Sequence, residues 1–228
     1  MKAVLWIALT VAAYLVGLAV RKAAGRHPVA NPVLIAMAIV IAALVATGTS
    51  YTEYFRATAP ITFLLGPATV ALGVPLAANA VHLHRSLRAV LLAVLAGSVA
   101  AMLAGFLLIC TLGGGATAAL SMLPKAVTTP IAMAVSQQIG GQPSLSAAFA
   151  ILGGIIAAIS LRAVLRLARV HSSHAMGLAA GTAGSGIAAA YVAAFGDGPA
   201  AFAAIGIGLN GLMTSVLAPL LLKFFHPL

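Results

Sequence analysis

The sequence predicts an all-α integral membrane protein with about seven to eight hydrophobic segments, some of them broken by proline or glycine, or re-entrant, at mid-membrane. Three observations support this fold class. Hydrophobic residues make up 63% of the chain and charged residues 6%, whereas a soluble domain carries about 25% charged residues. The mean hydropathy is +1.16. Apolar runs of about 20 residues, long enough to span a bilayer, recur along the whole length.

Eight apolar runs, separated by short connectors, follow one another along residues 1–228. We expect a single polytopic domain, with scaffold segments at 1–56 and 199–228 and a transport core at 57–195. The first run is interpreted as a retained helix, because its strongest positive cluster follows it, whereas a signal peptide carries that cluster in front. The expected segments are 3–20, 31–49, 60–81, 87–112, 115–140, 145–168, 173–195 and 199–225.

The charge balance is strongly basic, with 12 Lys and Arg against 2 Asp and Glu. These basic residues lie between apolar runs, where they act as topology signals and contact lipid headgroups. No basic stripe interleaved with aromatic residues offers a path for nucleic acid. The expected partner is therefore the lipid bilayer and not nucleic acid. Cys110 lies alone in an apolar run, and His171 and His174 are too few for a metal site, so no cofactor is expected.

Positive charge in the connectors predicts how the chain crosses the cell inner (plasma) membrane. Cytoplasmic loops carry an excess of Lys and Arg, so the basic connectors at 21–26, 85–88 and 162–169 are all placed inside. This puts the N-terminus outside. It also requires segment five to dip in and return as a re-entrant hairpin, with its turn near "PKAVTTP". Segment seven then crosses, Asp197 falls outside, and the C-terminus is cytoplasmic.

The stretch "SMLPKAVTTPIAMAVSQQ" carries the main chemical signal. Lys125 stands between Pro124 and Pro130, beside Thr128 and Thr129. Two prolines cannot occupy one undisturbed helix, and a broken helix inside a membrane is tolerated where it lines a cavity or is buried in protein. A lysine and two hydroxyls at such a break suit a small carboxylate. The alternative is a lysine near a membrane face that extends its amine to the headgroups.

A weak internal echo relates residues 66–87 to residues 123–145. The two stretches align from Pro67 and Pro124, and each continues through interrupted apolar sequence to Ser-Leu before a long plain helix. Corresponding interrupted segments in two halves point to a transport site. We therefore include Pro67, Thr69 and Asn79 among the expected substrate-binding residues. Chance likeness between proline-dotted membrane helices is the alternative explanation.

Segment seven is rich in small and hydroxyl residues. Gly177 and Gly181 form a small-xxx-small face, which lets helices approach one another closely. Packing explains Gly177 best. Thr182 and Ser185 are expected to line the cavity opposite the Lys125 loop, and they complete the set of expected binding residues.

Three motifs together resemble the LrgB/CidB family. They are "FLLGPATVALGVPL" at 63–76, "LPKAVTTPIAMAVSQQIGG" at 123–141 and "AMGLAAGTAGSGIAAA" at 175–190. The family includes antiholin-like membrane proteins and is related to the C-terminal half of the plastidial glycolate/glycerate translocator. The resemblance implies transport of small organic acids such as glycolate, glycerate or pyruvate. It also implies a link to murein hydrolase control and cell lysis, often beside an LrgA/CidA-type membrane partner.

The chain departs from this family pattern at three positions. Ala134 stands where relatives often carry Glu, Ser185 where they carry His, and Tyr191 where they carry Arg. Lys125 is then left as the main intramembrane charge, and hydroxyl and amide groups take a larger share of recognition.

Two function classes remain open, and a third is unfavourable. The first is a secondary carrier for a small anionic substrate. The second is a holin/antiholin-like pore or lysis regulator without carrier activity. Paired proline-broken segments around one lysine favour the carrier. An enzyme is not expected: "AGSG" at 183–186 resembles a serine nucleophile motif but has no evident base, and "GIGLNG" at 206–211 is assigned to helix packing. A homodimer is expected to provide a fixed scaffold.

Overall fold

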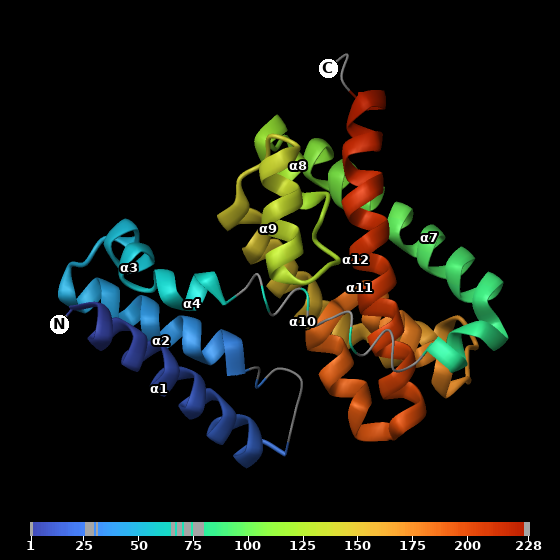
Figure 1. The fold of residues 1–228 in the computed structure, drawn as a ribbon, viewed down its shortest axis with the longest axis horizontal. Coiled ribbons are helices and arrows are strands. Elements are labelled where there is room, and N and C mark those ends of the chain that lie inside the picture. The colour runs from blue at the N-terminus through green and yellow to red at the C-terminus, as the bar shows by residue number, and fades with distance from the viewer. Residues whose placement is uncertain are drawn as a thin grey trace. The chain divides into compact units, whose positions relative to one another are not determined.

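The computed structural model describes residues 2–25, 30, 32–64, 67, 70, 74 and 80–225, and all regular structure in these ranges is helical (Figure 1). The chain divides into two compact units, residues 1–68 and 69–228. The predicted all-α membrane class is confirmed, because several helices are long and apolar enough to cross a membrane. Within the described ranges these helices are 2–23, 87–111, 143–167, 173–195 and 197–223.

The first unit is a pair of long helices followed by two short ones. Gly17 allows α2 to begin against α1, since a Cβ at Gly17 would lie 2.5 Å from the carbonyl oxygen of Pro32. α3 then turns by 117° from α2, and its first turn is capped by the Ser50 hydroxyl, which accepts from the Glu53 N–H. Trp6 meets Tyr54 edge to face at 5.5 Å. The helices are α1 (Lys2–Ala23), α2 (Pro32–Thr47), α3 (Tyr51–Ala57) and α4 (Ala59–Phe63).

Segments one and two of the sequence analysis correspond to α1 and α2. α3 was not predicted, because its mixed composition around Glu53 and Arg56 resembles a connector. Most of segment three, at 60–81, lies outside the described residues.

In the second unit, α7 (Ala80–Thr111) and α12 (Asp197–Phe225) run in the same direction (Figure 1). Val94 shares a buried cluster with Ile205, in the first half of each helix. Met102 shares another with Ala218, further along both helices. The bundle therefore has two ends: one holds the starts of α7 and α12, and the other holds their last turns.

α10 (Pro143–Leu167) runs the opposite way between these ends. Leu161, near the end of α10, shares a cluster with Ala203, near the start of α12. At the other end, the Ser146 hydroxyl donates to the carbonyl of Ser121 at 2.8 Å. α7, α10 and α12 thus connect the two ends of the unit.

Residues 116–138 form two short helices and not one spanning helix. They are α8 (Ala116–Met122) and α9 (Thr129–Gln138), joined by a segment of turns at 123–128. The N–H of Gln142, just after α9, donates to the Ser121 hydroxyl near the end of α8 at 2.7 Å. The chain therefore returns to the end from which it set out, and we call this segment the first hairpin. Pro130 opens α9, as expected for a residue that lacks an N–H. The break predicted in segment five is confirmed.

The structure corrects the expectation that segment seven is a plain crossing helix. α11 (Ser173–Val192) contains a non-helical residue, Ser185, with φ 49° and ψ −141°. A straight helix of 20 residues would be about 30 Å long. The two ends of this segment nevertheless meet. The His174 ring stacks on Phe202 of α12 at 4.6 Å, and a Cβ at Gly198 would lie 3.1 Å from His174 Nε2.

Residues 173–195 are therefore a second hairpin, folded at Ser185 and completed by the short helix η1 (Ala193–Phe195). Arg162, at the end of α10, lies 4.4 Å above the Phe195 ring. Phe195 adjoins Asp197, so the arginine connector and Asp197 lie at the same end of the unit. The expectation that they lie on opposite sides is wrong, because the fold at Ser185 removes one crossing.

Candidate functional site

The tips of the two hairpins meet at one side chain, Asn210. This residue lies at the midpoint of the span 197–223 and is 1% exposed. Its Nδ2 donates to the carbonyl of Ala126 at 2.9 Å and to the carbonyl of Thr182 at 2.9 Å. Ala126 belongs to the break of the first hairpin, and Thr182 lies three residues before the break of the second. One amide therefore holds both breaks at mid-height of the bundle.

The oxygen of the same amide is also occupied. Ser98, on α7 and 1% exposed, donates to Asn210 Oδ1 at 2.5 Å, and the Thr214 hydroxyl lies 3.5 Å from it. An asparagine side chain offers two donors and one acceptor oxygen. All of these groups are used, so Asn210 has no free polar atom of its own to offer a ligand. Its role is to fix the positions of its neighbours.

Lys125 packs its aliphatic stem against α7. A Cβ at Gly105 would lie 2.9 Å from Lys125 Cε, so the lysine stem lies directly over this glycine. The side chain is partly buried. The chain has two acidic residues, Glu53 and Asp197, and the ion pair within the described residues is Lys2–Glu53 at 3.0 Å. Lys125 therefore has no carboxylate partner among the described residues.

Three hydroxyl oxygens at the hairpin tips are buried without a hydrogen-bond partner in the described part of the chain: Thr128 Oγ1, Thr182 Oγ1 and Ser185 Oγ. Thr182 is 7% exposed and Ser185 8%. Thr128 occupies the N-cap of α9 but makes no side-chain capping bond. Buried polar groups are normally satisfied, so three orphan hydroxyls at two helix breaks make these tips the candidate site.

Of the residues expected to bind substrate, five lie at these tips and two open α9. Pro124, Lys125 and Thr128 lie in the first break, Ser185 forms the second break with Thr182 three residues before it, and Thr129 and Pro130 begin α9. Pro67 is described as an isolated, exposed residue, and Thr69 and Asn79 lie outside the described residues. The proposed echo between 66–87 and 123–145 lies largely outside them as well.

Asn210 was missed by the sequence analysis, which assigned "GIGLNG" to helix packing. The available signal was a carboxamide in the middle of an apolar span. Burying such a group without hydrogen bonds costs several kcal/mol, so it predicts polar partners nearby. Which partners it meets depends on segments far away in the chain.

The other two positions at which the chain departs from the LrgB/CidB family pattern lie away from the hairpin tips. Ala134 is exposed on α9. Tyr191 packs edge to face on Phe195 at 5.3 Å, beneath Arg162. The ring cluster therefore belongs to the arginine end of the unit and not to mid-height.

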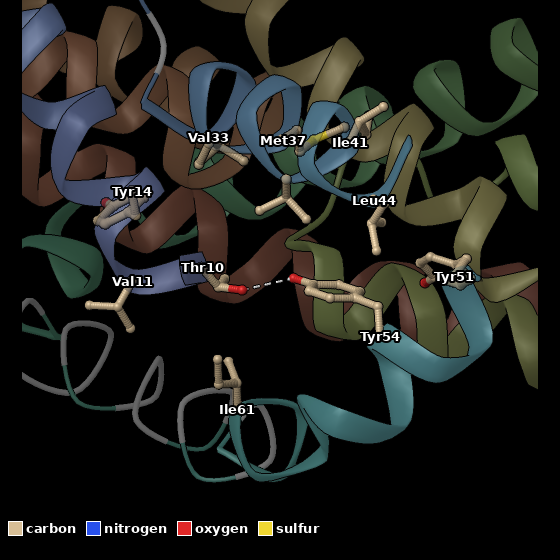
Figure 2. A pocket seen from close by; sticks show the side chains of 12 residues that line it. Thr10, Val11, Tyr14, Val33, Met37, Ile41, Leu44, Tyr51, Tyr54 and Ile61 are labelled. Carbon is tan, nitrogen blue, oxygen red and sulfur yellow. Dashed lines mark hydrogen bonds between the residues drawn. The ribbon is translucent and has the colours of Figure 1, made fainter. Parts of the chain in front are cut away.

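A separate pocket of about 590 Å³ lies within the first unit, where α1, α2, α3 and α4 meet (Figure 2). Tyr54 and Thr10 share a hydrogen bond of 3.0 Å across it. The remaining lining is mostly aliphatic or aromatic, and the described lining residues include no lysine or arginine. These residues therefore offer no cation to balance a carboxylate, and the pocket is a weaker candidate anion site than the hairpin tips.

Comparison with known proteins identifies relatives of this chain. Holin-like protein CidB of Staphylococcus epidermidis is 30% identical over 226 residues, which are 99% of this chain and 98% of that protein. Antiholin-like protein LrgB of Bacillus cereus is 32% identical over 195 residues, 85% of this chain and 84% of that protein. No solved structure matches the chain. The model of the LrgB-like family matches residues 10–224. The chain therefore belongs to the LrgB-like family.

Proposed function

We propose that this protein is a secondary carrier for small organic carboxylates, with its site between the two hairpin tips. The observation that carries the proposal is the meeting of two helix breaks at Asn210, with orphan hydroxyls on both sides. Broken helices that meet at mid-membrane are the usual substrate site of secondary transporters. A simple pore needs no such paired breaks.

The chemistry of the tips suits a small anion. Lys125 supplies a positive charge without a carboxylate partner in the described residues. The N-terminus of α9 adds the partial positive charge of a helix end. Thr128, Thr182 and Ser185 supply hydroxyl donors. Glycolate, glycerate and pyruvate combine a carboxylate with a neighbouring oxygen and fit this mixture of one charge and several hydroxyls.

The two hairpins support a proposal for the orientation in the membrane. Arg162 and Arg166 lie near the end of α10, at the same end of the unit as Arg88 near the start of α7. Lys223 lies at the opposite end. The positive-inside rule places the arginine end in the cytoplasm. We therefore propose that the C-terminus lies outside, in contrast to the cytoplasmic C-terminus expected from charge counting. We retain an outside N-terminus, because the basic residues Arg21 and Lys22 end α1.

Control of lysis is the second candidate function. It is favoured by the names of the relatives, which are holin-like and antiholin-like proteins. In this proposal the chain regulates murein hydrolase activity together with an LrgA/CidA-type membrane partner. Carrier activity and lysis control are compatible if the carboxylate is the signal.

We also propose that the chain forms a homodimer through residues 1–68, a compact unit in its own right. Crosslinking in native membranes checks this proposal. Capture of a monomer alone would remove it.

Uptake into liposomes that contain the purified protein tests the carrier proposal. Saturable uptake of glycolate, glycerate or pyruvate is expected, and Lys125→Ala should abolish it. Lys223→Ala is the matched control, because it removes an exposed lysine at the helix end and should leave uptake unchanged. Leakage of unrelated dyes that is indifferent to Lys125→Ala would favour the pore instead.

A further inference from the structure

The second unit repeats one arrangement in opposite orientations. α7 leads into the first hairpin, which enters from the end that holds the last turns of α7 and α12. α10, running the other way, leads into the second hairpin, which enters from the arginine end. Inverted repeats of this kind surround the midplane sites of many transporters. This pairing relates residues 87–138 to residues 143–195, and it differs from the echo seen in the sequence.

α12 stands outside the two repeats and contacts both tips. Its Asn210 donates one hydrogen bond to each: one to Ala126 of the first hairpin and one to Thr182 of the second, both at 2.9 Å. The two donors share one nitrogen, and Ser98 holds the amide oxygen. A tip that withdraws toward its own end of the bundle must break its bond to Asn210. The other tip can keep its bond.

We propose that Asn210 is the positioning residue of the carrier, tying both hairpin tips closed over the carboxylate site and releasing one tip at a time toward opposite faces of the membrane. This inference rests on the proposed function for its purpose. The clamp itself is a property of the fold and can be measured without transport.

Thiol labelling measures the opening of each tip. Cys110 is the single cysteine of the chain, so Cys110→Ser gives a background without thiols. Thr128→Cys and Ser185→Cys then place one thiol in each tip. Both are small changes at hydroxyls that have no partner among the described residues. A membrane-impermeant maleimide is added to sealed vesicles of either orientation.

Asn210→Leu keeps a branched side chain of similar size but removes both donors. A neutral hydrogen bond changes an opening equilibrium by about two- to tenfold, and we expect labelling to accelerate by that factor at both thiols. The Thr128→Cys thiol should react faster from one side of the membrane and the Ser185→Cys thiol from the other. Ser215→Ala is the matched control, because it removes a hydroxyl of α12 that donates within its own helix to the Gly211 carbonyl and leaves Asn210 unchanged. It should change labelling less than twofold.

Two measurements keep the result decisive. An Ala116→Cys thiol, at the exposed start of α8, reports general loosening. If its labelling rises as much as that of the tips, or if Asn210→Leu leaves both tips unchanged, the clamp is refuted. If Asn210→Leu does not fold, Asn210→Ala also removes both donors and carries the same expectation. Faster tip labelling without carboxylate uptake by the wild type would retain the clamp and remove the carrier. Carboxylate uptake by the wild type, together with tip labelling that Asn210→Leu leaves unchanged, would retain the carrier and remove the clamp.

Discussion

Gly105 offers a test that separates substrate binding from folding. A Cβ at this position would lie 2.9 Å from Lys125 Cε, 3.2 Å from Lys125 Cδ and 3.0 Å from Met122 Cγ. These are flexible parts of long side chains, so Gly105→Ala should be accommodated by moving Lys125 by a few tenths of an ångström. A helix-interior Gly→Ala change itself stabilises by about 0.5–1 kcal/mol. The free energy of unfolding should therefore stay within about 1 kcal/mol of wild type or rise.

Uptake should respond differently. A misplacement of 1 Å can cost about 100-fold in a well-oriented site, so a shift of a few tenths predicts a rise in KM of about three- to tenfold. The assay pairs thermal unfolding in detergent with initial rates of carboxylate uptake into liposomes. Gly153→Ala is the matched control on α10, since its Cβ would make an ordinary contact of 3.6 Å with the Lys125 carbonyl. A wild-type KM for Gly105→Ala in a stably folded protein would refute the placement of Lys125 in the site.

Three further predictions follow from the same geometry. Gly181→Ala should destabilise the protein by about 1–3 kcal/mol, because its Cβ would collide with the backbone carbonyl of Ala203 on α12. The control Gly186→Ala places its Cβ in open space and should unfold at the wild-type temperature. Equal unfolding temperatures for the two variants would contradict this packing. Ser185→Gly should raise the free energy of unfolding by about 1 kcal/mol, because Ser185 has a φ of 49° that glycine adopts without strain. The same change should slow uptake, because the hydroxyl is lost. A lower unfolding temperature than that of the wild type would count against a strained backbone at Ser185. An epitope placed after the last residue should react with antibody added to intact cells. A reaction seen only in permeabilised cells would mean that the C-terminus is cytoplasmic.

The helical content and the first hairpin could be predicted because their signals are local. Apolar runs of sufficient length identify membrane helices, and Pro124 and Pro130 interrupt one of them within seven residues. The gathering of Lys125 and Thr128 in one break follows directly from their spacing. None of this requires knowledge of distant contacts.

The second hairpin and Asn210 could not be predicted from local signals. α11 contains no proline, and its break depends on a serine between two glycines, a pattern equally common in close helix packing. Charge counting assigned a membrane crossing to segment seven. Because one missed hairpin removes a crossing, every later segment is then placed on the wrong side of the membrane. The partners of Asn210 lie 84 and 28 residues away, so the sequence around it could predict a need for partners but not their identity.

The solitary charge of Lys125 has an electrical consequence. In the proposed carrier, a protonated Lys125 without a carboxylate partner in the described residues would make the empty site cationic, and a bound monocarboxylate would make it neutral. Moving one charge through the membrane potential changes the free energy by about 2.3 kcal/mol per 100 mV. The membrane potential would therefore affect the step in which the empty carrier reorients, and it would not affect the reorientation of the loaded carrier. Exchange of one carboxylate for another should be insensitive to voltage, while net uptake should follow the membrane potential.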